Sequence, residues 1–113
     1  MIARGEIANS FMNKTERQYA DRLEILRRAG EVQWFTFESV KLRLANNTFY
    51  TPDFAVMNAE GELEMHEVKG FWRDDARVKI KVAASMYPFR FIAVRKKPKS
   101  RGGDWEFEEF VGG

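Results

Sequence analysis

The chain has 113 residues, of which 44% are hydrophobic and 14% aromatic, enough for the core of one compact domain and little more. It contains no cysteine, which excludes disulfide bridges, thiolate metal sites and a cysteine nucleophile. No apolar run approaches the roughly 20 residues of a membrane-spanning helix, and the N-terminal segment lacks the continuous apolar stretch of a secretory signal. We therefore expect a cytoplasmic protein with no membrane partner.

Positive charge is concentrated in one segment of the chain. Overall, nineteen basic residues face seventeen acids, a net charge of +2. Between Lys69 and Arg101, however, eleven basic residues face only Asp74 and Asp75. Such a segment is typical of proteins that bind a polyanion, because each neutralised phosphate releases counterions. Charge alone leaves a solvated basic surface open as an alternative.

The first element expected in chain order is a helix between Asn13 and Gly30. Asn13 and Glu16 have the spacing of a capping box, and Gly30 stands where a C-terminal stop is expected. The apolar stripe of this helix comprises Tyr19, Ala20, Leu23 and Leu26. Glu16 lies at the end of the buried face.

The middle of the chain predicts strands. Residues 32–44 are rich in aromatic and β-branched side chains and are predicted as one long, bent strand. A turn follows at Asn46 and Asn47. Residues 48–57 and 62–70 are predicted to pair as a hairpin.

A second helix is expected at about 75–86, and Pro88 ends it. Its inward residues are expected to be Val78, Val82 and Met86. A core strand at 89–94, a basic glycine-containing loop and a short edge strand at 105–110 complete the chain.

The order α-β-β-β-α-β predicts an α/β fold, in which a mixed sheet is flanked by helices. We expect a single domain, with its core at about 13–95 and with residues 96–113 as a basic loop plus an edge strand.

The hairpin has the most specific pattern in the chain. If residues 59–61 form a three-residue loop with Gly61 in the left-handed conformation, Asp53 and Glu67 lie opposite each other on one face of the sheet. Lys69 lies on the same face, and Val68 points the other way. Two facing carboxylates repel each other, and a hard divalent cation such as Mg²⁺ or Mn²⁺ relieves that repulsion. The pattern predicts a metal site beside an amine that polarises a water or stabilises charge on a phosphate.

Pro52-Asp53 followed by Glu67-Val68-Lys69 resembles the signature of the PD-(D/E)XK nuclease superfamily, whose core has the same order of elements. From about Asn13 to Arg95 the chain is similar to small phage-encoded and prophage-encoded members. The matching positions are Glu16, Gly30-Glu31-Val32, Asp53-Phe54, Val68-Lys69-Gly70, Lys79 and Tyr87-Pro88.

The resemblance implies a role for each matching residue. Asp53 and Glu67 would bind the metal, with the Val68 main-chain carbonyl as a further ligand, and Lys69 would help to activate the attacking water. Glu16 would support the metal from the first helix. Relatives often carry a Gln near the position of Glu38. Glu38 is therefore a candidate for supporting the metal ligands or for binding the metal itself, or it is a departure from the pattern. Lys79 would contact a phosphate. The concentration of positive charge adds Arg73, Arg77, Lys81, Lys96, Lys97, Lys99 and Arg101 as candidate DNA-binding residues, with ordinary solvated side chains as the alternative.

We therefore expect a Mg²⁺- or Mn²⁺-dependent DNA endonuclease, directed more by DNA structure and backbone than by base sequence. A chain this small offers little surface for DNA, so a homodimer is expected. A phage or host DNA-processing protein is a candidate partner, and a phage-encoded chain would act in the bacterial cytoplasm. The two alternatives are a resolvase for branched DNA and a non-catalytic nucleic-acid-binding protein.

Each candidate residue also has a structural interpretation. Glu16 can simply complete the capping box, Lys69 can be an ion-pair partner of Glu67, and the two carboxylates can be unrelated surface acids. His66, the only histidine, points away from Glu67 and favours a structural role. Phe71 and Trp72 are expected to pack against the core or its rim, with stacking on DNA bases as the alternative.

Overall fold

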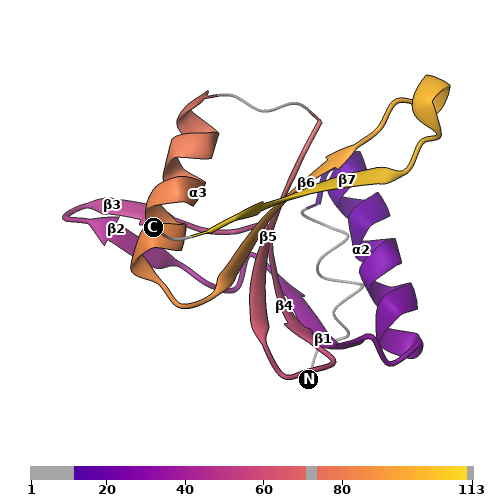
Figure 1. Ribbon diagram of the computed structural model, residues 1–113, viewed down its shortest axis with the longest axis horizontal. Coiled ribbons are helices and arrows are strands. Elements are labelled where there is room, and N and C mark those ends of the chain that lie inside the picture. The colour runs from indigo at the N-terminus through magenta and orange to yellow at the C-terminus, as the bar shows by residue number, and fades with distance from the viewer. Residues whose placement is uncertain (1–11, 71–73, 112–113) are drawn as a thin grey trace.

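A five-stranded mixed sheet is the central feature of the computed structural model, which describes residues 12–70 and 74–111 (Figure 1). Its strands, in spatial order, are β1 (Val32–Phe37), β4 (Phe54–Asn58), β5 (Leu63–Lys69), β6 (Arg90–Lys96) and β7 (Trp105–Phe110). β5 and β6 are parallel, and the other neighbours are antiparallel. Parallel pairing requires a crossover, and helix α3 (Asp74–Met86) provides it.

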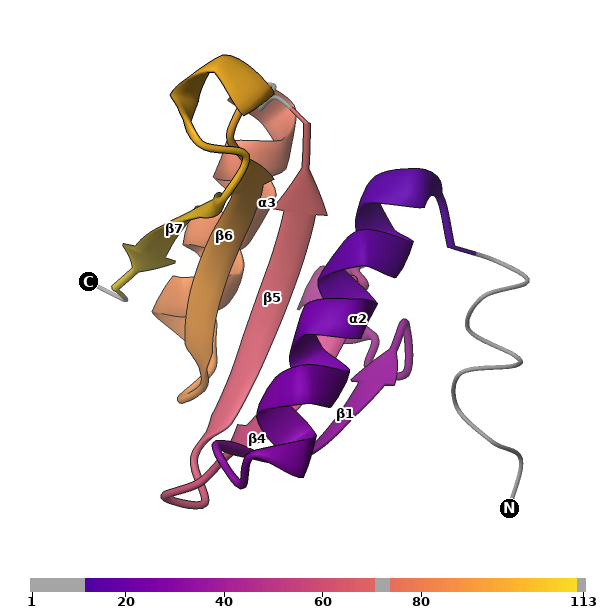
Figure 2. The same cartoon turned by 90° about the vertical axis from the view of Figure 1, so that its right-hand side faces the viewer.

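Helices α2 and α3 lie on opposite faces of this sheet (Figures 1 and 2). Helix α2 (Lys14–Arg28) covers the face formed by Phe54, Val56 and Val68, and α3 covers the face formed by Ala55, Met65 and Ala93. Since side chains alternate along a strand, β4 and β5 contribute to both cores. The expected α/β class is confirmed. No helix in the described ranges has the length and apolar character needed to cross a membrane.

Helix α2 begins where the sequence predicts. The Asn13 side chain accepts a hydrogen bond from the Glu16 backbone N–H (2.8 Å), and Glu16 Oε1 accepts one from the Asn13 backbone N–H (2.9 Å). This capping box satisfies two donors that a helix start would leave unpaired. Tyr19 and Leu23 are buried against the sheet, and Ala20 and Leu26 are partly buried. The N-terminus of α2 is therefore held at a defined place relative to β4 and β5.

The single strand expected at 32–44 is instead two strands in different sheets. β1 ends at Phe37, and β2 (Leu42–Ala45) pairs with β3 (Thr48–Tyr50) in a small separate sheet. The break occurs at Glu38, whose φ of +49° leaves the extended region. Val40, Leu42 and Leu44 then pack into the core beneath α3. The expected strand at 48–57 is divided in the same way, because residues 51–53 separate β3 from β4.

The inward face expected for the second helix is wrong. Val78, Val82 and Met86 are exposed by 57%, 37% and 50%, whereas Ile80, Ala83 and Ala84 are buried. Both sets have helical spacing, so the sequence offers two apolar stripes. The stripe with two alanines packs on the sheet because short side chains let α3 approach the core that also contains Tyr50 and Phe91.

Candidate active site

The β4–β5 hairpin has the predicted register. Ala55 pairs with Met65 and Met57 with Leu63. The turn contains Gly61 at φ +83°, and the backbone N–H of Asn58 donates to the Glu62 carbonyl (3.0 Å). A side chain on Gly61 would be strained in this conformation. The glycine thus fixes the pairing that brings the segment of Asp53 opposite Glu67.

Two hydrogen bonds between side chain and backbone tie Asp53 to strand β5, one through Val68 and one through Glu67. The Val68 backbone N–H donates to Asp53 Oδ2 (2.8 Å), and the Asp53 backbone N–H donates to Glu67 Oε1 (3.2 Å). Both residues are buried, with 6% and 8% of their surface exposed. Among the described residues, Asp53 Oδ1 has no hydrogen-bond partner. Each carboxyl group is held rigidly and keeps acceptor capacity.

Burial is the first cause of the raised pKa values of both acids. Burial and the adjacent charge of Glu67 raise the pKa of Asp53 to about 8, against the opposing hydrogen bond from Val68. Burial also raises the pKa of Glu67, although Lys69 and the Tyr50 hydroxyl oppose the rise. The pair is therefore costly to ionise completely unless a cation lies beside it.

Lys69 supplies one positive charge at this place. Its Nζ lies 3.4 Å from Glu67 Oε2, and its side chain is 40% exposed. Burial lowers the pKa of Lys69, but the charges of Glu67 and Asp53 outweigh that effect, so its pKa is raised. Lys69 is thus an ammonium group that can donate hydrogen bonds and stabilise negative charge.

Tyr50 is a residue of this site that sequence reasoning missed. Its hydroxyl donates to Glu67 Oε1 (3.0 Å), and the residue is buried at the end of β3. Burial, followed by the charge of Glu67, raises the pKa of Tyr50 well above its usual range, so the hydroxyl keeps its proton and remains a donor. The sequence carries no local signal for this contact, because β3 belongs to the small sheet and its position depends on α3.

The supporting residues expected around the pair contribute unequally. Glu16 is half-buried and close enough for its charge to raise the pKa of Asp53, but its Oε1 is engaged in the capping box. The Val68 side chain points to the α2 face, as predicted. Glu38 meets Asp53 through the backbone, since its N–H donates to the Asp53 carbonyl (2.8 Å). The Glu38 side chain is exposed.

An open pocket of about 280 Å³ lies beside Glu67, and Asp53 is not among its lining residues. Glu67 and Lys69 line it from β5, and Lys79 lines it from α3. The remaining lining residues are Phe49, Tyr50, Thr51, Asp75 and Ala76. The fold therefore brings Lys79, a predicted DNA-binding residue, to the same pocket as Glu67 and Lys69.

The other predicted DNA-binding residues divide into several groups. Arg77 forms a two-pronged ion pair with Glu108 (2.9 and 2.8 Å), and Lys81 is exposed on α3. Lys96 lies over the Trp105 ring (4.8 Å), on the α2 face and away from the carboxylates. Lys97, Lys99 and Arg101 belong to the β6–β7 loop, which contains the short 3₁₀ helix η1 (Lys99–Arg101). Arg73, Phe71 and Trp72 lie outside the described residues.

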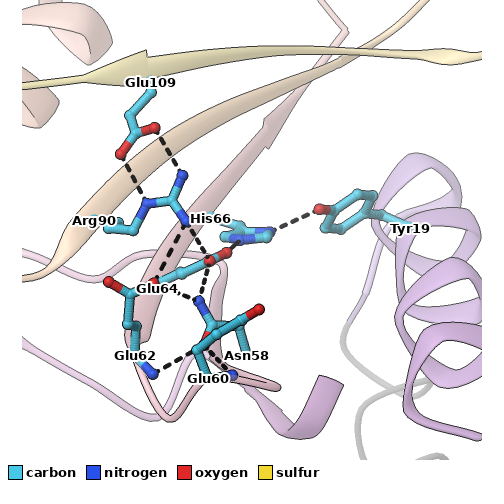
Figure 3. Close-up of polar contacts among 8 residues, drawn as sticks. All are labelled: Tyr19, Asn58, Glu60, Glu62, Glu64, His66, Arg90 and Glu109. Atoms are coloured by element: carbon cyan, nitrogen blue, oxygen red, sulfur yellow. Dashed lines mark hydrogen bonds and ion pairs between the residues drawn. The ribbon is translucent and has the colours of Figure 1, made fainter. Parts of the chain in front are cut away.

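His66 occupies the opposite face of the sheet, as predicted, within a buried polar network (Figure 3). Its Nε2 lies 2.8 Å from Glu64 Oε1, and its Nδ1 lies 2.7 Å from the Tyr19 hydroxyl. Burial opposes ionisation of Glu64, but its hydrogen bonds from His66 and Asn58 lower its pKa overall. We assign the ring proton to Nε2, because an ionised Glu64 needs a donor, and Nδ1 of a neutral ring then accepts from Tyr19. The network ties α2 to β5.

The residues of the carboxylate pair can be compared with what a divalent cation requires. Among residues 12–70 and 74–111, no three side chains of His, Cys, Asp or Glu are grouped closely enough to hold a metal ion. Mg²⁺, however, is commonly held by one or two carboxylates, with water and substrate phosphate completing its shell. Asp53 and Glu67 are oxygen donors whose joint ionisation a cation would favour, so they fit such an ion.

Comparison with known proteins found no matching family model, no matching curated protein and no matching solved structure.

Proposed function

We propose that this protein is a metal-dependent nuclease that hydrolyses phosphodiester bonds in DNA at Asp53, Glu67 and Lys69. The observation that carries the proposal is the buried pair of Asp53 and Glu67 with the ammonium group of Lys69 beside it. Glu67 and Lys69 line a pocket. Burying two carboxylates together costs free energy that a purely structural role does not repay. Such arrangements concentrate at functional sites. The resemblance to the PD-(D/E)XK signature supports the same interpretation.

In this proposal each residue of the site has its own role. Asp53 and Glu67 hold Mg²⁺ or Mn²⁺, which when bound supplies an activated water and stabilises charge on the phosphate. Tyr50 and the Asp53 backbone hold Glu67 Oε1, which leaves Oε2 directed to Lys69. Lys69 orients the water or the scissile phosphate by donating hydrogen bonds, and its positive charge offsets the charge that develops in the transition state.

DNA is the proposed substrate because a basic end of the molecule surrounds this pocket. Lys79 lines it, and the start of α2, the end of β5 and the basic β6–β7 loop lie at the same end of the fold (Figure 2). Carboxyl ends of parallel strands are the usual place for ligands in open α/β sheets. We extend the proposal to a homodimer, in which two such sites would act on two strands.

The test is cleavage of supercoiled plasmid by purified protein with Mg²⁺ or Mn²⁺. We expect nicking by the natural protein and loss of at least about a hundredfold in rate for Lys69→Ala, in the range seen when one charge-stabilising donor is removed. Arg28→Ala is the matched control, because it also removes one positive charge but lies at the far end of α2 with its side chain 76% exposed. Equal nicking by the natural protein and Lys69→Ala would contradict the proposal.

A second candidate function is DNA binding without hydrolysis. It is favoured by the absence of a third ligating side chain among the described residues and by the engagement of Glu16 in its own helix cap. The same assay separates the two, because a protein that binds DNA and leaves it intact with both Mg²⁺ and Mn²⁺ is not a nuclease.

A further inference from the structure

The face of β6 and β7 beside the candidate active site carries a second polar pocket. Its volume is about 260 Å³, and its lining residues are Arg77, Ala93, Arg95, Glu106, Phe107 and Glu108. We call it the arginine–glutamate pocket. Ala93 is the smallest of these lining residues.

Strand register places this pocket next to the catalytic candidates. Lys69 on β5 pairs with Arg95 on β6, and Arg95 pairs with Glu106 on β7. Paired residues of neighbouring strands point to the same face, and the strands are about 4.8 Å apart. Glu67, Ala93 and Glu108 form the adjacent row. The strand predicted from the sequence ends at residue 94, which leaves Arg95 in the loop, whereas β6 continues to Lys96.

Each arginine of the pocket is neutralised by a glutamate from β7. Glu108 accepts two hydrogen bonds from Arg77 (2.9 and 2.8 Å), and Glu106 Oε1 accepts one from Arg95 (3.1 Å). Glu106 also lies 3.4 Å from Arg101. The hydrogen bonds from Arg77 and, more weakly, the charges of Lys81 and Arg95 lower the pKa of Glu108. Four cations therefore surround two carboxylates.

We propose that this pocket receives the DNA phosphate next to the one held at Lys69, and that Glu106 and Glu108 occupy the phosphate's place until DNA binds. A carboxylate and a phosphate present similar paired oxygens to an arginine, so one can replace the other. The inference rests on the proposed action on DNA and adds the surface that receives the neighbouring backbone. The two glutamates thus compete with DNA and limit its non-specific binding.

The opposite face of the same strands has a similar ion pair but a different charge balance. Arg90 donates two hydrogen bonds to Glu109 (2.9 and 2.8 Å) and a third to Glu64 (3.0 Å), as Figure 3 shows. Glu62 also lies 4.0 Å from it. Three acids around one arginine leave this face unsuited to a phosphate. Glu108 and Glu109 therefore form a natural comparison, because they are neighbours on one strand and are 51% and 42% exposed.

The experiment measures binding of a fluorescently labelled DNA duplex by anisotropy in EDTA, where hydrolysis does not occur. We expect Glu108→Gln to tighten binding about three- to fivefold, as expected for removing one charge about 5 Å from a phosphate in water. Glu109→Gln removes the same charge on the other face, and we expect a change below about twofold. Arg95→Gln should weaken binding by a similar factor and reduce the salt slope by about 0.9, which corresponds to one phosphate contact.

The outcomes separate clearly. If Glu108→Gln and Glu109→Gln tighten DNA binding equally, net charge alone matters and the inference is overturned. Unchanged DNA binding by Arg95→Gln would also overturn it, as would a natural protein that does not bind DNA. Glu106→Gln provides a second variant on the proposed face, and thermal melting of every variant verifies folding. Plasmid nicking is measured separately. A protein that binds DNA with this pattern but does not cut it would contradict the proposed nuclease activity and would still support the proposed phosphate-binding pocket.

Discussion

Replacing Asp53 with asparagine should stabilise the metal-free protein, and increasingly so as the pH rises. The pKa of Asp53 is about 8 in the folded protein, against about 3.9 in an unfolded chain. The folded protein therefore binds more protons between these values. The stability contributed by Asp53 is complete below the unfolded pKa and is lost as the pH rises through the folded pKa. The asparagine of the variant would keep a carbonyl oxygen to accept from Val68 and would carry no charge.

The size of the effect follows from the pKa difference. Each pH unit between the two pKa values costs about 1.4 kcal/mol, so the natural protein should lose up to about 4 kcal/mol of unfolding free energy between pH 5 and pH 8 through this one group. Glu67, whose pKa is also raised, acts in the same direction. Glu64, Glu108 and Glu109 have lowered pKa values, so the stability that they contribute is lost only as the pH falls below this range.

The assay is urea denaturation in EDTA at pH 5, 6, 7 and 8, with both proteins measured at each pH. The difference between their curves reports Asp53 together with Glu67, because the variant also removes the charge that Asp53 exerts on its neighbour. We expect this difference to grow with pH, and Mg²⁺ at pH 8 to stabilise the natural protein more than the variant. A natural protein with constant stability from pH 5 to pH 8, or a variant with the same slope, refutes the reasoning.

Two further substitutions test contacts on the two faces of the sheet. Tyr50→Phe removes the hydrogen bond to Glu67 Oε1. It should lower the unfolding free energy by about 1 kcal/mol and weaken Mn²⁺ binding by up to about fivefold, the same free energy expressed as an affinity. A large fall in the thermal midpoint with unchanged Mn²⁺ affinity would assign Tyr50 to the core instead. Tyr19→Phe leaves His66 Nδ1 buried without its partner and should lower the unfolding free energy by about 1–3 kcal/mol in urea, with plasmid nicking at saturating Mg²⁺ unchanged. Slower nicking by this folded variant would show that the network also serves the site.

Local signals predicted the parts of the molecule that depend on neighbouring residues. The capping box of Asn13 and Glu16 predicted the start of α2, and Gly61 predicted the hairpin register. That register is the reason why the sequence pattern places Asp53, Glu67 and Lys69 on one face. The second helix shows the limit of such patterns, because its two apolar stripes are equally good by spacing.

Sequence alone determined the identity of the two facing acids and the amine beside them, because a tight turn and strict alternation act over fewer than twenty residues of chain. Only the tertiary structure decided what surrounds them. Tyr50, Lys79 and Arg95 reach the site through a separate small sheet, a crossover helix and a parallel strand. These contacts join residues far apart in the chain. They depend on which of several equivalent apolar faces packs inward, and the packing of the whole core determines that face, not any one segment.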